Sequence, residues 1–280
     1  MEQIVLIIPG SGPTDRNGNN PLGVSAGTYK LLAEDLAKKG ISSLRIDKRG
    51  LYGSSSATEN PNNVTVNDYV EDIIDWISLI KEKLGCKNIW LLGHSEGGLI
   101  ALKSTLISPT CSSGLILVAT SGVSFGQLLR KQINQNLSNT TVMNDAFVII
   151  DQLENGQHVE MSLYDTSLQQ LFAPVVQDYL IDLMSHEPVE LISEINIPTL
   201  ILQGDQDIQV SVENANKLKK AQPRSKLVIL NGVNHILKQP KVQKDKALTI
   251  SENLASYRDP KLELAPKITK EICQFIIDQN

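Results

Sequence analysis

Short, continuous runs of apolar residues recur along the chain, and each is followed by turn-forming residues. Runs of this kind are typical of strands that are buried on both faces of a parallel sheet. Helical periodicity separates the first four runs, so the order β-α-β-α-β-α-β predicts parallel strands joined by right-handed crossovers. The runs span residues 4–8, 41–46, 89–92, 115–118, 198–202 and 226–230.

The helix expected after residue 65 has the clearest periodic pattern. Thr65 and Asp68 have the spacing of a capping box, in which each side chain accepts a hydrogen bond from the other residue's backbone amide. Apolar positions then recur at the intervals that place side chains on one buried face of a helix. These positions are Val66, Tyr69, Val70, Ile73, Ile77, Ile80 and Leu84.

The alternation of strands and helices stops after the fourth strand. Residues 121–190 carry several amphipathic helix patterns, and strand character returns only at residues 198–202. This pattern predicts one domain over residues 1–280, with residues 121–190 forming a helical lid inserted between core strands. The stretch over about 236–264 is polar with mixed charge, and Pro266 opens the last predicted helix.

The turn after the third strand has the sequence Gly93-x-Ser95-x-Gly97. This pattern is that of a nucleophile elbow, in which a tight turn holds a serine in strained backbone geometry above the sheet. The helix that begins at Glu96 would point its N-terminal amides at the place where negative charge develops in the reaction. Glycine-rich strand-to-helix turns also occur without catalysis, so the interpretation depends on the neighbouring strand ends.

Two later strand ends carry the other groups that a serine nucleophile needs. Serine becomes reactive when a base removes its proton, and a third group must orient that base. Asp205 and Asp207 follow the fifth predicted strand, and His235 follows the sixth. Because the carboxyl ends of parallel strands lie at one edge of the sheet, we expect these side chains beside Ser95. The sequence therefore predicts a triad of Ser95, His235 and a carboxylate.

Several motifs together resemble those of a known superfamily. They are Gly93-His94-Ser95-Glu96-Gly97-Gly98, Asp47-x-Arg49-Gly50-x-x-Gly53-Ser54, Gly204-x-x-Asp207 and Gly232-x-x-His235. With them, the chain resembles the α/β-hydrolases over nearly its whole length. The opening loop is similar to that of a branch of bacterial serine esterases, through Pro9-Gly10-Ser11-Gly12-Pro13-x-Asp15-Arg16-x-Gly18-Asn19. The resemblance implies an α/β-hydrolase fold, a doubly wound and mostly parallel sheet with a helical lid.

The same resemblance implies roles for individual residues. The second Asp of such a loop is normally the triad acid, so Asp207 is expected to hold His235 while Asp205 caps the turn. The oxyanion hole is expected to consist of the amides of Glu96 and Ser11. Family members usually have two strands before the strand that carries the oxyanion loop. Here the chain starts almost at that strand, so we expect a missing sheet edge or an incomplete N-terminus.

Other polar residues near these motifs are interpreted as structural. His94 is expected to pack away from the solvent side of the elbow. Asp15 and Arg16 are expected to form an ion pair that braces the opening loop. Arg49 is also interpreted as structural, and the carboxylate of Glu96 as favourable simply because it lies at a helix N-terminus.

Composition and charge narrow the class of protein further. The net charge of −5 disfavours nucleic acid as a partner, because such binding requires a clustered basic surface. His158 and His186 have no partners at metal-ligand spacing, so no metal site is expected. Three cysteines in an odd number indicate buried thiols in a reducing compartment. With no apolar segment of about 20 residues and no signal peptide, the sequence predicts a soluble, cytoplasmic protein.

These features predict a carboxylesterase that cleaves a small-molecule acyl ester through an acyl-enzyme, without a cofactor. A thioesterase, an acyltransferase or a small-peptide hydrolase would use the same triad with a different leaving group or acceptor. A ligand receptor on the same fold, in which the triad only helps binding, is an alternative of a different class. The sequence leaves the acyl chain, the alcohol and the oligomeric state open.

Overall fold

A computed structural model of the chain describes residues 3–136, 139–240 and 248–279. Its centre is a six-stranded sheet with the order β2-β1-β3-β4-β5-β6, in which every pair of neighbouring strands is parallel. All six predicted strands are confirmed. They are β1 (Gln3–Ile8), β2 (Ser42–Arg45), β3 (Asn88–His94), β4 (Gly114–Val118), β5 (Thr199–Gly204) and β6 (Lys226–Leu230).

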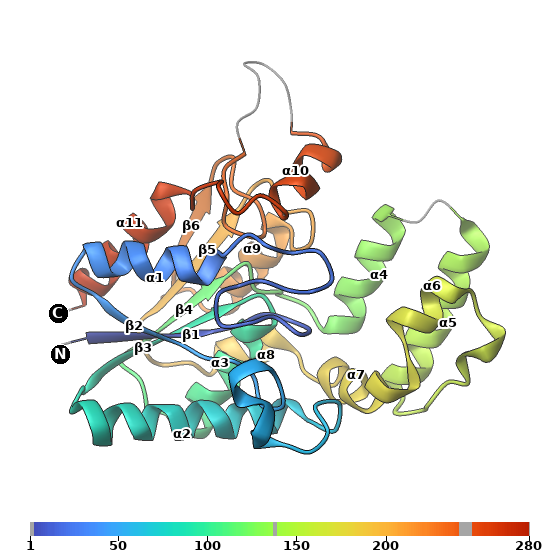
Figure 1. The fold of residues 1–280 in the computed structure, drawn as a ribbon, viewed down its shortest axis with the longest axis horizontal. Coiled ribbons are helices and arrows are strands. Elements are labelled where there is room, and N and C mark those ends of the chain that lie inside the picture. Colours follow the sequence, from blue (N-terminus) through green and yellow to red (C-terminus); the bar gives the residue numbers. More distant parts are fainter. Residues whose placement is uncertain (1–2, 137–138, 241–247, 280) are drawn as a thin grey trace.

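Helices cover both faces of the sheet, as the doubly wound prediction requires (Figure 1). Alternate residues of a strand point to opposite faces. Val5 and Ile7 accordingly belong to the apolar cluster under α1 (Thr28–Lys38) and α11 (Pro266–Asp278). Ile4, Leu6 and Ile8 belong to the cluster on the other face. The helices of that face are α2 (Val66–Leu84), α3 (Glu96–Ile107), α8 (Pro188–Ser193) and α9 (Val212–Ala221).

The ends of α2 show why this helix starts and stops where the sequence predicts. The Thr65 hydroxyl accepts a hydrogen bond from the Asp68 amide, and the Asp68 carboxylate accepts one from the Thr65 amide. This reciprocal pair satisfies two amides that the first turn of a helix leaves without partners. Gly85 ends the helix in the left-handed conformation, at φ 62°.

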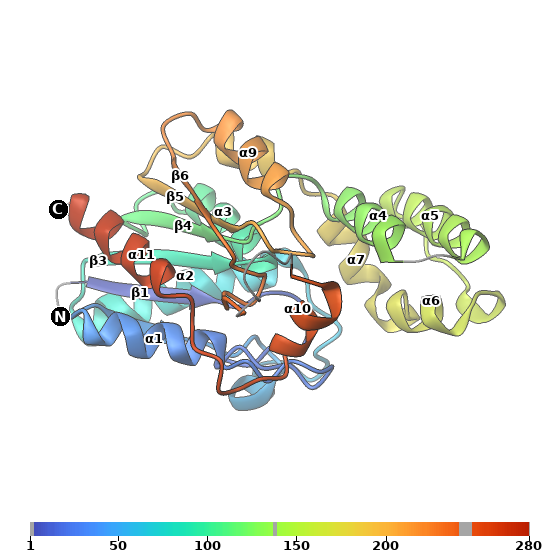
Figure 2. The same ribbon diagram turned by 90° about the horizontal axis from the view of Figure 1, so that it is seen from above.

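The insert between β4 and β5 forms a helical lobe beyond the carboxyl ends of the strands (Figure 1 and Figure 2). Buried side chains within the lobe make up a hydrophobic cluster separate from those of the sheet. The lobe contains α4 (Phe125–Asn136), α5 (Thr140–Glu154), α6 (Thr166–Leu171) and α7 (Gln177–Met184), with short 3-10 turns at Met161–Leu163 and Pro174–Val176. The chain then returns to the sheet through α8, which begins just before the predicted end of the insert at residue 190.

The polar stretch over residues 236–264 contains a helix that the sequence pattern did not predict. The helix α10 (Ile250–Ser256) lies within it, and Thr249 and Glu252 form a capping box at its start. Its short apolar pattern was hidden among polar residues. Residues 241–247 lie outside the described part of the chain.

Two other expectations concern the described residues as a whole. No described helix is both long and apolar enough to cross a membrane. Cys86, Cys111 and Cys273 are buried free thiols, as predicted.

Candidate active site

The turn between β3 and α3 has the strained geometry of an elbow. Ser95 has φ 55° and ψ −122°, a conformation that a residue with a side chain adopts only when its surroundings impose it. A Cβ atom at Gly93 would lie 2.3 Å from the carbonyl oxygen of Gly97, and one at Gly97 would lie 2.3 Å from that of Ile8. Glycine is therefore required on both sides of Ser95, as the sequence pattern indicates. The Ser95 amide donates to the carbonyl of Val118, which ties the turn to β4 (2.9 Å).

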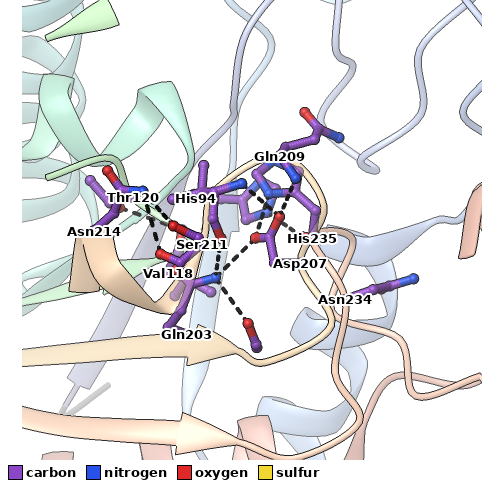
Figure 3. A network of polar contacts seen from close by, with 12 residues as sticks. His94, Val118, Thr120, Gln203, Asp207, Gln209, Ser211, Asn214, Asn234 and His235 are labelled. Carbon is purple, nitrogen blue, oxygen red and sulfur yellow. Dashed lines mark hydrogen bonds and ion pairs between the residues drawn. The ribbon is translucent and has the colours of Figure 1, made fainter. Parts of the chain in front are cut away.

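Asp207 and His235 lie together at the same edge of the sheet, in the loops after β5 and β6. The Nδ1 atom of His235 lies 2.8 Å from Oδ2 of Asp207 (Figure 3). The Asp207 side chain is fully buried and that of His235 is 6% exposed. The pair is thus shielded from solvent except where the imidazole faces the cavity that it shares with Ser95.

The carboxylate of Asp207 is fixed by more than the histidine. Its Oδ1 accepts hydrogen bonds from the amides of Gln209 and Val210, both at 2.8 Å. Its Oδ2 also accepts one from the Gln203 side chain (3.0 Å; Figure 3). Burial alone would raise the pKa of Asp207, but the charge and hydrogen bond of His235 and the two amides hold it below its ordinary value. The group is therefore a carboxylate at neutral pH.

Asp205 occupies a different place in the same loop. Its Oδ1 accepts a hydrogen bond from the Gly232 amide at 2.7 Å, and its own amide donates to the carbonyl of Leu230 at 3.1 Å. Asp205 thereby joins the loop after β5 to the loop after β6. This geometry matches the turn-bracing position expected for Asp205 and leaves the contact with His235 to Asp207.

His94 does more than pack behind the elbow. Its Nδ1 lies 2.9 Å from the Tyr29 hydroxyl and its Nε2 lies 2.8 Å from the backbone oxygen of His235. Burial lowers the pKa of His94 to about 3, and the neighbouring His235 adds to the shift, so the ring is neutral. We infer that Nε2–H donates to His235 while Nδ1 accepts from Tyr29. The Tyr29 hydroxyl in turn accepts from the Gly10 amide (2.9 Å).

This chain of hydrogen bonds also bears on the oxyanion hole. Because the Gly10 amide is bonded to Tyr29, it cannot serve there. Among the described contacts, the amides of Ser11 and Glu96 donate no hydrogen bond. Ser11 and Ser95 line the same two cavities. The two amides expected from the sequence are therefore not engaged in any of the described hydrogen bonds.

The expected ion pair between Asp15 and Arg16 is not what braces the opening loop. Arg16 instead contacts Asp47, which accepts hydrogen bonds from the Arg16 amide and Nε, both at 2.7 Å. Asp15 accepts from the amides of Asn17 and Asn19, both at 2.8 Å, and closes a turn within the loop. The sequence pattern favoured Asp15 because it is adjacent to Arg16. The fold instead places Asp47, 31 positions away, in contact with the arginine.

Two cavities meet at Ser95 and Ser11. The first, of about 140 Å³, contains the imidazole of His235 and is bordered by polar side chains. These are Ser11, Thr14, Asn20, Thr28, Tyr29, His94, Gln209 and Tyr257. The second, of about 40 Å³, is mostly apolar and lies between the sheet and the insert. Its apolar lining consists of Leu99, Val123, Phe125, Leu128, Leu183, Pro188 and Val210.

The described residues contain no cluster of three side chains that could hold a metal ion. His158 pairs with Asp178 at 2.7 Å on the surface of the insert. His186 lies at the edge of the apolar cavity, 3.2 Å from Nζ of Lys103. Arg49 pairs with two carboxylates of α2, which agrees with the structural interpretation of this residue.

The comparison with known protein families matches most of the chain. The family described as "Serine aminopeptidase, S33" matches residues 22–239. Esterase EstD of Thermotoga maritima is 24% identical over 242 residues, which cover 83% of this chain and 54% of that protein. The hydrolase YugF of Bacillus subtilis is 26% identical over 198 residues, or 64% of this chain and 68% of that one. The chain therefore spans only about half the length of the esterase.

Solved structures confirm the fold. Est1E from Butyrivibrio proteoclasticus aligns with a TM-score of 0.60 at 16% identity, over 99% of this chain and 88% of that one. A thermophilic esterase from Thermogutta terrifontis aligns with a TM-score of 0.59 at 16% identity, over 100% and 90% of the two chains. At these identities the likeness concerns the fold, and it agrees with the α/β-hydrolase architecture predicted from the sequence.

Proposed function

Because the chain belongs to the S33 serine aminopeptidase family of α/β-hydrolases, we propose that it is a carboxylic ester hydrolase with a Ser95–His235–Asp207 triad. The observation that carries the proposal is the buried pair of His235 and Asp207, whose imidazole faces the cavity bordered by Ser95. Ser95 is held in the strained turn that such a nucleophile requires.

The reaction follows from these positions. Nε2 of His235 removes the hydroxyl proton of Ser95, whose Oγ attacks the ester carbonyl. The oxyanion that forms accepts hydrogen bonds from the amides of Ser11 and Glu96. The imidazolium then gives its proton to the departing alcohol, and an acyl-enzyme remains. Water, deprotonated by the same imidazole, releases the acid and restores Ser95.

The two cavities suggest how an ester lies in the site. The leaving oxygen must be within reach of His235, which borders only the polar cavity of the two. We therefore place the alcohol portion among the hydroxyl and amide groups of that cavity. The acyl portion then occupies the apolar cavity under the insert, beside Leu99 and Leu128. In this arrangement the insert acts as a lid that limits the size of the acyl group that the site accepts.

Leu128→Trp is expected to shift the preference of the enzyme toward shorter acyl chains. Leu128 is buried in α4 and borders the apolar cavity, so a larger ring there occupies space that the acyl chain needs. A methylene group in such a pocket is worth about tenfold or more in kcat/KM. With p-nitrophenyl esters of increasing chain length, we expect activity toward the longer esters to fall by at least about tenfold relative to the acetate.

The matched control is Leu163→Trp, because Leu163 is on the same insert but is 90% exposed and borders neither cavity. It should leave the chain-length profile unchanged. If Leu128→Trp has the melting temperature of the wild type and an unchanged chain-length profile, the insert does not form the acyl site.

The family description raises aminopeptidase activity as a second candidate. An aminopeptidase must bind a free α-amino group, which calls for a carboxylate in the cavity. Among the described residues that line the two cavities, the acid is Glu96, and its carboxylate faces Lys48. This pairing favours an ester over a peptide with a free amino terminus.

The proposed function is tested by comparing p-nitrophenyl esters with aminoacyl p-nitroanilides and an acyl thioester. Triad-dependent turnover of the esters supports the proposal. Faster turnover of the anilides or the thioester would support a small-peptide hydrolase or a thioesterase, and an acyl product formed with an added alcohol would support an acyltransferase. Ligand binding without any turnover would indicate a receptor.

A further inference from the structure

We propose that Lys48 is a positioning residue that fixes both amides of the oxyanion hole. Lys48 lies in the loop after β2, and its side chain is 5% exposed. Its Nζ donates to the carbonyl oxygen of Gly10 at 2.9 Å and lies 3.5 Å from Oε1 of Glu96. One buried cation thus contacts the two segments that carry the proposed oxyanion donors. The inference rests on the proposed hydrolase function.

The contact with Gly10 sets the direction of the Ser11 amide. The carbonyl of Gly10 and the N–H of Ser11 belong to one peptide unit, which is planar and trans, so the two groups point in opposite directions. Because Lys48 holds the carbonyl, the N–H must point in the opposite direction, and Ser11 borders both cavities that meet at Ser95. The Gly10 amide is held on its other side by Tyr29.

The contact with Glu96 acts on the second amide. Glu96 is the first residue of α3, and its carboxylate is also 5% exposed. The ion pair restrains the side chain whose own backbone N–H lies next to Ser95. Together the two contacts fix the distance between the elbow and the opening loop, which belong to different strands.

The surroundings of Lys48 are suited to a fixed cation. Its Nζ lies 5.3 Å from the centre of the Tyr69 ring, a distance at which the face of the ring attracts a cation. Tyr69 packs edge to face against Tyr179; the Tyr69 ring is buried and that of Tyr179 is half-buried. A buried charge without partners is costly, so a lysine at this place requires the contacts that it makes.

A simpler role would be to neutralise Glu96, and the two roles predict different results. Lys48→Met removes both contacts and leaves the carboxylate unpaired. Glu96→Gln removes one charge but keeps the bond from Lys48 to Gly10. The double variant Lys48→Met/Glu96→Gln has no buried charge and no bond to Gly10. If Lys48 only balances charge, the double variant should recover both stability and activity.

We expect the double variant to recover stability but not activity. Its kcat for p-nitrophenyl acetate should be about 10²-fold below that of the wild type, which is the size of effect seen when one oxyanion donor is lost, while KM changes little. Glu96→Gln should lose less activity than either variant that lacks Lys48. Melting temperatures of all three variants separate loss of fold from loss of function.

The affinity for a trifluoromethyl ketone provides a readout that a purely structural role would not change. Such a ketone adds to the nucleophile and places an oxyanion in the hole, whereas the acid product does not. In the double variant we expect the ketone to bind about 10²-fold more weakly and the acid product to bind as before. Equal weakening of both, or wild-type activity in the double variant, would overturn the inference.

Ser95→Ala, measured in the same assay, separates this inference from the proposed function. If Ser95→Ala is inactive and the double variant is fully active, only the role of Lys48 is refuted. If Ser95→Ala keeps wild-type activity, the triad itself is refuted, and the inference about Lys48 is refuted with it.

Discussion

Replacing Ser95 with alanine is expected to lower kcat for ester hydrolysis by on the order of 10⁶ and to leave the fold intact. The serine oxygen is the atom that forms the acyl-enzyme, and no other group in the proposed reaction can replace it. The close packing at Gly93 and Gly97 and the hydrogen bond from the Ser95 amide to the carbonyl of Val118 hold the backbone of the turn, and none of them involves the hydroxyl. Alanine also adds no side-chain volume to the turn.

The measurement is kcat for p-nitrophenyl acetate, with the melting temperature as the test of folding. Ser78→Ala is a matched control, because Ser78 lies on α2 and bonds to the carbonyl of Ile74, away from both cavities. It should keep wild-type activity. A Ser95→Ala protein that is folded and loses less than about tenfold in kcat would show that hydrolysis does not depend on this serine.

Asp207→Asn is expected to lower kcat by about 10⁴, as the corresponding change does in another Ser–His–Asp enzyme. The carboxylate accepts from Nδ1–H of His235 and stabilises the imidazolium that forms during attack. An asparagine of the same shape can turn its NH₂ group toward Nδ1, which holds the imidazole in the tautomer that cannot accept the serine proton. The backbone amides of Gln209 and Val210 would still hold the side chain in place.

Asp205→Asn is the matched control from the same loop, two residues away. It weakens the bond to the Gly232 amide without touching His235, so we expect a loss of about 0.5–2 kcal/mol in the free energy of unfolding. Its kcat should stay close to that of the wild type. The roles would be reversed if Asp205→Asn were inactive and well folded while Asp207→Asn stayed active.

The sequence allowed the sheet and the strand ends that carry the proposed triad residues to be predicted, because both depend on short-range patterns. Buried parallel strands appear as continuous apolar runs, and the residues just after them must lie at one edge of the sheet. The register places Gly93 beside Ile8 and Gly204 beside Leu230, which brings the polar loops together. The order of Ser95, Asp207 and His235 along the chain then limits which residues can meet.

The contacts that support the site could not be predicted in the same way. Tyr29 and His94 are 65 positions apart, and nothing in the local pattern of either residue indicates the other. Lys48 occupies the variable place of the Asp47-x-Arg49 motif, and its position alone does not show that its side chain turns inward. Arg16 was paired with the adjacent Asp15 because the sequence does not show that the fold brings Asp47 close to it. Such pairs depend on how loops pack, which periodicity does not describe.

The most direct test of the proposed chemistry is to identify the residue that a serine-directed organophosphonate modifies. The phosphonate forms a stable bond only with an activated nucleophile, so its site of attachment reports reactivity rather than mere exposure. Peptide mass spectrometry should find one adduct, on Ser95, that appears in step with the loss of ester hydrolysis and is absent from a folded His235→Ala variant. An adduct on any other residue, or full activity with Ser95 modified, would contradict the account.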